Sequence, residues 1–304
     1  MKKLLFSVAA VAAFGALNAQ DTVAQTEPKL TDEQKAEAAA DAKAEEESDS
    51  GFWTELSVDL LSDYMWRGVI LNNNWCWQPS VSIGYNTEDF GGIYFNYWGS
   101  YDFTHRRNSC AGGGNSRMRG GVQEDDYYLG YTKSFGNLDL EAGYYWYVYP
   151  NNHGGHCAGH LGMDFYAGAF YNNDWVTPGV EVLWACANNN GHEPGTAYYR
   201  FSVKHDFEIE SIEGLTITPK ATLGVGNVAF VQNNTGMSGA QTQMTDQTLT
   251  LKASYAVTDN FSVGVNANYT WTPSRTLRHQ HYMDCGDSHK DQIFWGGFNA
   301  TLSF

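Results

Sequence analysis

The chain has 304 residues, a net charge of −16 and an aromatic content of 15%. This acidic balance argues against a nucleic-acid-binding protein, which needs a basic patch. After the first twenty residues the sequence contains no run of eighteen apolar residues, which excludes a transmembrane helix.

The N-terminus has the pattern of a secretory signal peptide. Lys2 and Lys3 precede a short apolar stretch over residues 4–15, and small residues follow near Ala19. The stretch is too short for a membrane span. Residues 1–19 are therefore predicted to be a signal peptide, and the exported chain would enter a compartment that permits disulfides.

Residues 20–50 are predicted to form a disordered acidic spacer in the periplasm. Between residues 21 and 50 the chain carries ten acidic and three basic residues and no aromatic residue. Such a composition cannot bury enough apolar surface to offset the entropy of ordering. A docking tail for a periplasmic partner is the alternative interpretation.

From residue 51 onward, apolar and polar residues alternate as they do in β-strands. In residues 138–148, Leu, Leu, Ala, Tyr, Trp and Val occupy one face, and residues 261–271 show the same period. We count twelve such segments, which begin near residues 53, 75, 92, 124, 138, 163, 176, 196, 214, 246, 260 and 290.

The connections between these segments alternate between short and long. Short ones cover 135–137, 172–174 and 258–260, and long ones cover 104–123, 150–162, 227–245 and 272–289. An even number of strands with short turns at one end is typical of outer-membrane barrels. In a bilayer the sheet must also close, because lipid cannot satisfy free edges.

Residues 51–304 are therefore predicted to be an all-β domain, a transmembrane antiparallel up-and-down β-barrel of about twelve strands. The alternative is a secreted β-sandwich or a soluble barrel, but aromatic residues near the strand ends favour interface girdles. The expected location is the outer membrane of a Gram-negative bacterium, with the spacer and the C-terminus in the periplasm. The expected partners are membrane lipid, lipopolysaccharide and, through Phe304, the barrel-assembly machinery.

The motif LSDYMWRGV, at residues 61–69, resembles the SDYxxRG signature of the TorF-like family of outer-membrane porins. The resemblance implies a barrel over residues 51–304, a porin-like role and no catalytic residues. Five cysteines and histidine-rich loops set this sequence apart from that family.

If the apolar face contacts lipid, the other face lines the lumen. Arg67 is expected on the first strand, and four other bases fall on three consecutive strands opposite an acidic wall. With the signal peptide (+2) and the spacer (−7) removed, −11 of the net charge belongs to residues 51–304. The predicted pore-lining residues are Asp59, Asp63, Arg67, Asp102, Asp126, Glu141, Asp164, Glu181, Arg200, Lys204, Lys220 and Lys252.

These charges predict a channel for passive diffusion of small polar solutes or ions, with a weak preference for cations. The alternative is that the charges pair with one another and fill the barrel, because small barrels fill their interior with side chains.

Cysteines and histidines concentrate in the long loops. His153, His156, Cys157 and His160 supply donors suited to zinc or copper. Disulfides that pin the loops are the competing interpretation, and the candidate pairs are Cys110 with Cys157 and Cys76 with Cys285. The rival function is a surface-exposed binding protein whose loops bind a metal or a partner, with the barrel as an anchor.

Apart from a loop metal, the sequence predicts no cofactor, and it predicts no enzyme activity. The stretch GVGNVA at residues 224–229 matches a dinucleotide-binding pattern, but no helix is expected after it. The motifs G-x-S-x-G and H-E-x-x-H and the P-loop do not occur.

Overall fold

The structure is a computed structural model that describes residues 51–103, 121–150, 161–187, 195–235, 240–274, 277 and 291–304. The predicted signal peptide and spacer lie outside these ranges. The wall consists of twelve long strands, namely β1 (Gly51–Leu61), β4 (Cys76–Thr87), β5 (Gly91–Asp102), β6 (Val122–Phe135), β7 (Leu138–Val148), β8 (Leu161–Tyr171), β9 (Thr177–Ala187), β10 (Ala197–Lys204), β12 (Leu215–Gly226), β13 (Gln243–Ala256), β14 (Phe261–Trp271) and β15 (Gln292–Ser303).

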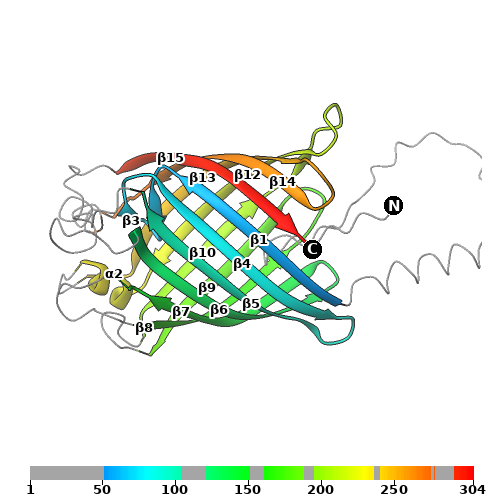
Figure 1. The fold of residues 1–304 in the computed structure, drawn as a ribbon. Helices are drawn as coiled ribbons and strands as arrows, with labels where there is room; N and C mark the ends of the chain where they lie inside the picture. Colours follow the sequence, from blue (N-terminus) through cyan, green and yellow to red (C-terminus); the bar gives the residue numbers. More distant parts are fainter. Residues whose placement is uncertain are drawn as a thin grey trace, which may run out of the picture.

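The sheet closes on itself (Figure 1). Each strand pairs antiparallel with its neighbours in the chain, and β1 pairs with both β4 and β15. At the closing seam Leu56 lies opposite Leu302 and Asp59 lies opposite Asn299. The two-residue strand β11 (Phe207–Glu208) is added beside β12, while β10 pairs directly with β12. The predicted twelve-stranded up-and-down barrel is confirmed.

Side chains alternate between the two faces of the wall, as the sequence predicts. On β1, Phe52 is 78% exposed on the outside, whereas Trp53 is 8% exposed on the inside. Exposed apolar surface costs about 25 cal/mol per Å² in water, so the outer face requires a lipid environment. Aromatic pairs mark both ends of this face: Phe52 with Tyr85, and Trp77 with Tyr101. The barrel is therefore of the membrane-spanning, outer-membrane type.

The two ends of the barrel differ. At the turn end, strands are joined by residues 88–90, 136–137, 172–176 and 257–260, and the C-terminus lies there (Figure 1). At the loop end lie α2 (Val228–Thr235) and the hairpin of β2 (Tyr64–Trp66) and β3 (Val69–Asn72). Within the part of the chain that the structure describes, no helix has the length and hydropathy needed to cross a bilayer.

The prediction that Arg67 lies on the first strand is wrong. β1 ends at Leu61, and Trp66 pairs with Val69 across a two-residue turn of Arg67 and Gly68. Both turn residues have positive φ, 47° and 83°, as a type I′ hairpin turn requires. The alternating pattern continues past β1, but this turn folds the chain back on itself.

Candidate functional site in the barrel lumen

The hairpin β2–β3, residues 64–72, crosses the lumen from β1 to the opposite wall. The Tyr64 hydroxyl donates to Oε2 of Glu124 on β6 at 2.8 Å. The Trp66 ring stacks on Phe230 of α2, with centroids 5.9 Å apart. Thr272, beyond β14, donates from Oγ1 to the Gly68 carbonyl at 3.3 Å. The hairpin thus contacts elements around much of the barrel and narrows the lumen at the loop end.

Gly68 is required at the hairpin tip for reasons of space as well as conformation. A Cβ atom at this position would lie 3.0 Å from the carbonyl oxygen of Thr245 and 3.0 Å from the Cβ of Asp246. Only glycine lets the tip approach β13 this closely, and glycine also adopts positive φ without steric cost.

Arg67 attaches the hairpin tip to the far wall. Its Nη2 donates to Asp164 Oδ2 on β8 at 3.1 Å and to the Tyr147 hydroxyl on β7 at 3.0 Å. Tyr147 in turn donates to the same Asp164 oxygen at 3.1 Å. The guanidinium also lies 4.3 Å from the Trp66 ring centroid. These groups are buried, with the side chains of Arg67 and Asp164 9% and 2% exposed. We call this set the Arg67 latch.

The Arg67 latch orients the hairpin more than it adds net stability. Burying both charges costs several kcal/mol per ion, which the pairing roughly offsets. Removing one partner is different, because it leaves the other charge buried and unpaired, at a cost of about 3–5 kcal/mol. The geometry of the tip therefore depends on keeping Arg67 and Asp164 together.

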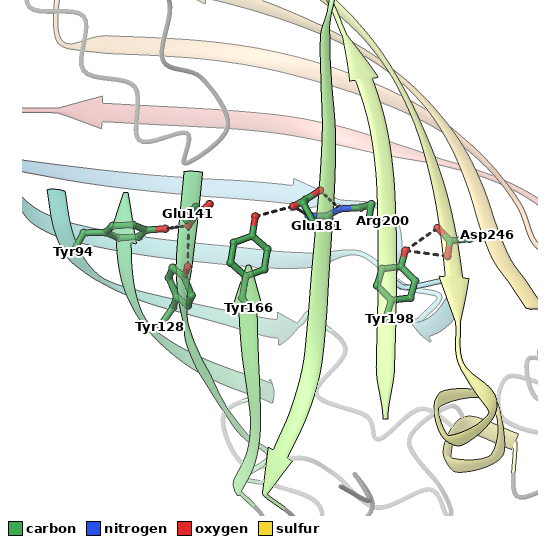
Figure 2. A network of polar contacts seen from close by, with 8 residues as sticks. All are labelled: Tyr94, Tyr128, Glu141, Tyr166, Glu181, Tyr198, Arg200 and Asp246. Carbon is green, nitrogen blue, oxygen red and sulfur yellow. Dashed lines mark hydrogen bonds and ion pairs between the residues drawn. The ribbon is translucent and has the colours of Figure 1, made fainter. Parts of the chain in front are cut away.

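One side of the lumen is filled by a tyrosine belt, defined as Tyr94, Tyr128, Tyr166 and Tyr198 (Figure 2). Each hydroxyl donates to a carboxylate on another strand. Tyr94 and Tyr128 donate to Glu141, Tyr166 donates to Glu181 at 2.9 Å, and Tyr198 donates to Asp246 at 3.1 Å. Buried carboxylates need such partners. These carboxylates are therefore hydrogen-bonded within the wall.

Glycines in the wall make room for the belt. A Cβ at Gly130 would lie 2.6 Å from atoms of both the Tyr94 and the Tyr128 rings, and one at Gly143 would lie 2.7 Å from Tyr128. The tyrosine rings therefore lie flat against the sheet where glycine leaves space. The sequence pattern does not predict the belt, because tyrosines occur on both the lumen-facing and the lipid-facing side of the strands. Glycines at lumen-facing positions next to these tyrosines are the sequence feature that could have predicted the belt.

The structure describes all twelve predicted pore-lining residues. Arg67 is at the hairpin tip, and Asp63 lies in the segment that follows β1, where it accepts a hydrogen bond from Ser62. Asp102 ends β5 and accepts a hydrogen bond from Asn72 of β3 at 2.9 Å. The remaining nine lie on the lumen-facing side of wall strands, namely Asp59, Asp126, Glu141, Asp164, Glu181, Arg200, Lys204, Lys220 and Lys252.

The bases do not simply face an acidic wall across the lumen. Arg200 forms a bidentate pair with Glu181, its cross-strand neighbour on β9, with Nε 2.6 Å from Oε2. Lys204 approaches Asp206, two residues further along the chain, at 3.5 Å. Two of the lumenal bases are therefore neutralised by acidic residues close to them, and not by acids on the opposite wall. This arrangement corrects the predicted facing of opposite charges for Arg200.

The turn-side half of the lumen holds a basic patch of Arg200, Lys204, Lys220 and Lys252. Lys204 and Lys220 are direct cross-strand partners, and such like-charged pairs destabilise a sheet unless they are screened. The Arg200 side chain is 37% exposed, and Lys220 and Lys252 are partly exposed. Asp59, also partly exposed, interacts electrostatically with Lys252. The lumen on this side of the hairpin is therefore a charged vestibule that water reaches.

The predicted loop chemistry lies mostly outside the described residues. This holds for the metal candidates His153, His156, Cys157 and His160, and for the disulfide candidates Cys110 and Cys285. Cys76 is buried, and it forms no disulfide with the other cysteine that the structure describes, Cys186. Among the described ranges no group of three or more metal-ligating side chains is assembled. The metal site and the disulfide pairings stay predictions.

The chain belongs to the Gcw_chp family, described as a bacterial protein of unknown function, whose match covers residues 45–281. A search of the curated proteins found no match. The resemblance to TorF-like porins stays a prediction.

The chain is also similar in shape to solved porins. One is the KdgM porin, at 10% identity and a TM-score of 0.42, covering 83% of this chain and 99% of that one. Another is the NanC porin, at 9% identity and a TM-score of 0.44, covering 83% and 98%. Both the sequence identities and the TM-scores of these two matches are low. The closed antiparallel wall and its apolar outer face are what make the protein a membrane-spanning barrel of the outer-membrane type.

Proposed function

We propose that the protein is an outer-membrane channel through which small polar solutes or ions diffuse passively, with the β2–β3 hairpin as its constriction. The observation that carries this proposal is the vestibule, where partly exposed charges of both signs line the inside of a closed barrel. Charged groups inside a membrane protein are expensive and usually mark a solute or ion path. A barrel that served only as an anchor would gain nothing from them.

In this mechanism the charges of the vestibule select which solutes enter, and the hairpin limits their passage through the lumen. Charges fixed in a narrow, low-dielectric lumen create a field that orders water and favours polar solutes over apolar ones. The net negative charge of the barrel favours cations weakly, and the basic patch opposes that preference. Passage at the loop end requires the hairpin to move or the solute to fit beside it.

The orientation and partners follow from the same proposal. The turn end, with the C-terminus and the acidic spacer, would face the periplasm, and the long loops would face the outside. The apolar outer face would contact lipid and lipopolysaccharide, and Phe304 at the end of the chain would be available to the barrel-assembly machinery. Metal binding by the loop residues stays a prediction, and the proposed channel does not depend on it.

Ion selectivity tests the proposal. The refolded protein in a planar lipid bilayer should conduct, and its reversal potential under a salt gradient should show a weak cation preference. Replacing both Lys220 and Lys252 by Gln should increase that preference, because two lumenal cations are lost. The matched control is Lys133→Gln on β6, whose ammonium lies outside the lumen near the Phe135 ring. An unchanged reversal potential in the double variant would count against a path through the vestibule.

A further inference from the structure

A cavity of about 360 Å³ lies between the hairpin and the barrel wall. Its lining includes Tyr64 and Trp66 of the hairpin and Trp98, Tyr145 and Trp295 of β5, β7 and β15. This volume falls within the range of small-molecule sites, which are mostly apolar with a few placed polar groups. The cavity is therefore large enough for a ligand of a few heavy atoms.

The aromatic rings of the cavity are held in place by contacts with the wall. Tyr64 and Trp98 pack with centroids 5.4 Å apart and an interplanar angle of 56°. Tyr64 donates its hydroxyl proton to Glu124, and Trp295 donates from Nε1 to Thr270 at 3.0 Å. Because the Tyr64 hydroxyl and the Trp295 Nε1 already have protein partners, the rings of Tyr64 and Trp295 offer a ligand mainly their carbon surfaces.

The polar part of the cavity combines the Asp126 carboxylate with the side-chain amides of Gln78 and Asn96, whose amino groups already donate to serine hydroxyls. Asp126 lines the cavity, and its Oδ1 is buried without a hydrogen-bond partner among the described residues. The same holds for Oε1 of Glu124, which lies two residues away on the same face of β6, and for Oδ1 of Asp164. A buried acceptor without a donor costs about 1–3 kcal/mol, and more when charged. Arg67, the cation beside them, donates to the other oxygen of Asp164.

We propose that this cavity binds a small organic ammonium ion. The ammonium N–H groups would donate to the Asp126 carboxylate, and the positive charge of the ammonium would offset the excess of carboxylates. The alkyl part of the ligand would pack against Trp98 and Trp295. The faces of these rings would also attract the charged nitrogen, because aromatic faces attract cations within about 6 Å. An anion would be repelled by the carboxylates, and a neutral alcohol would leave their charge uncompensated. The binding site goes beyond the proposed channel and does not depend on conduction.

Isothermal titration calorimetry on the refolded protein in detergent tests the proposal. The probes are butylammonium chloride, butanol and sodium butyrate, at constant ionic strength. Butylammonium should give saturable binding, and butanol and butyrate should give none at the same concentrations. This comparison needs no variant, so it stands even where a substitution prevents folding. Equal binding of butanol, or no binding of butylammonium to folded protein, would overturn the proposal.

A substitution then locates the site. Asp126→Asn keeps the shape of the side chain and removes its charge, and it should weaken butylammonium binding by about 10- to 100-fold, which corresponds to the loss of one charge-assisted hydrogen bond. The matched control is Asp139→Asn on β7, whose carboxylate accepts a hydrogen bond from Asn172 at the turn end. Wild-type affinity in Asp126→Asn, with folding shown by heat-modifiable gel mobility, would refute the assignment of this site.

Discussion

Replacing Arg67 by alanine should release the hairpin tip. The substitution removes the donors to Asp164 and Tyr147, at 3.1 and 3.0 Å, together with the contact over Trp66. It leaves the Asp164 carboxylate, 2% exposed, without its cation. The change concerns a segment inside the lumen, so the pairing of the wall strands is not altered.

The size of the effect follows from the burial of the pair. Removing one partner of a buried ion pair costs about 3–5 kcal/mol. At 1.4 kcal/mol for each factor of ten, this shifts the equilibrium between the attached and the released tip by about 10²- to 4 × 10³-fold. Tyr64 still holds the base of the hairpin to Glu124, and Trp66, next to the turn, still stacks on Phe230. The expected release is therefore local to the tip.

Single-channel recording measures this release. Arg67→Ala should show openings that are larger or longer than those of the wild type, and Arg67→Lys should fall between the two, because it keeps the charge but loses the planar fork. Lys133→Ala, a loss of charge outside the lumen, serves as the matched control and should behave as the wild type. If Arg67→Ala is folded and its conductance equals that of the wild type, then the tip does not limit passage and the reasoning fails.

Three further substitutions test the lumen as described. Gly130→Ala should lower the free energy of unfolding by roughly 1–3 kcal/mol, because its Cβ would meet the Tyr94 and Tyr128 rings at 2.6 Å. Wild-type stability in urea titrations would show that the belt can shift. Glu181→Gln should leave the Arg200 charge uncompensated and move the reversal potential towards anions, and a shift towards cations would contradict the pairing. Trp66→Ala should lengthen openings, because its stack on Phe230 is lost, and unchanged dwell times would exclude this contact from gating.

The wall of the barrel could be predicted because its signals are local. Alternation fixes which face each residue occupies, and the short turns fix the antiparallel pairing of neighbours. The prediction for the segment 138–148 agrees with β7 at both ends, and the predicted segment 260–271 agrees with β14 to within one residue. Errors at strand ends stayed small, as with the last strand, expected near residue 290 and found from Gln292.

The contents of the lumen could not be predicted in the same way. The Arg67–Gly68 turn breaks a pattern that otherwise reads as a continued strand, and only contacts with distant residues such as Asp164 and Thr272 place it inside. Alternation does not reveal which tyrosine reaches which carboxylate. Those partners come from different strands, at sequence separations that the shape of the barrel determines.

The measurement that tests the central claim most directly compares the conductance of the wild type with that of a variant in which residues 64–72 are replaced by a short Gly-Ser linker. Both proteins are refolded, checked by heat-modifiable gel mobility and recorded in the same bilayer. A channel constricted by the hairpin predicts a several-fold larger, steady conductance in the variant, with the cation preference retained. Equal conductance, or silence from both folded proteins, would contradict the account.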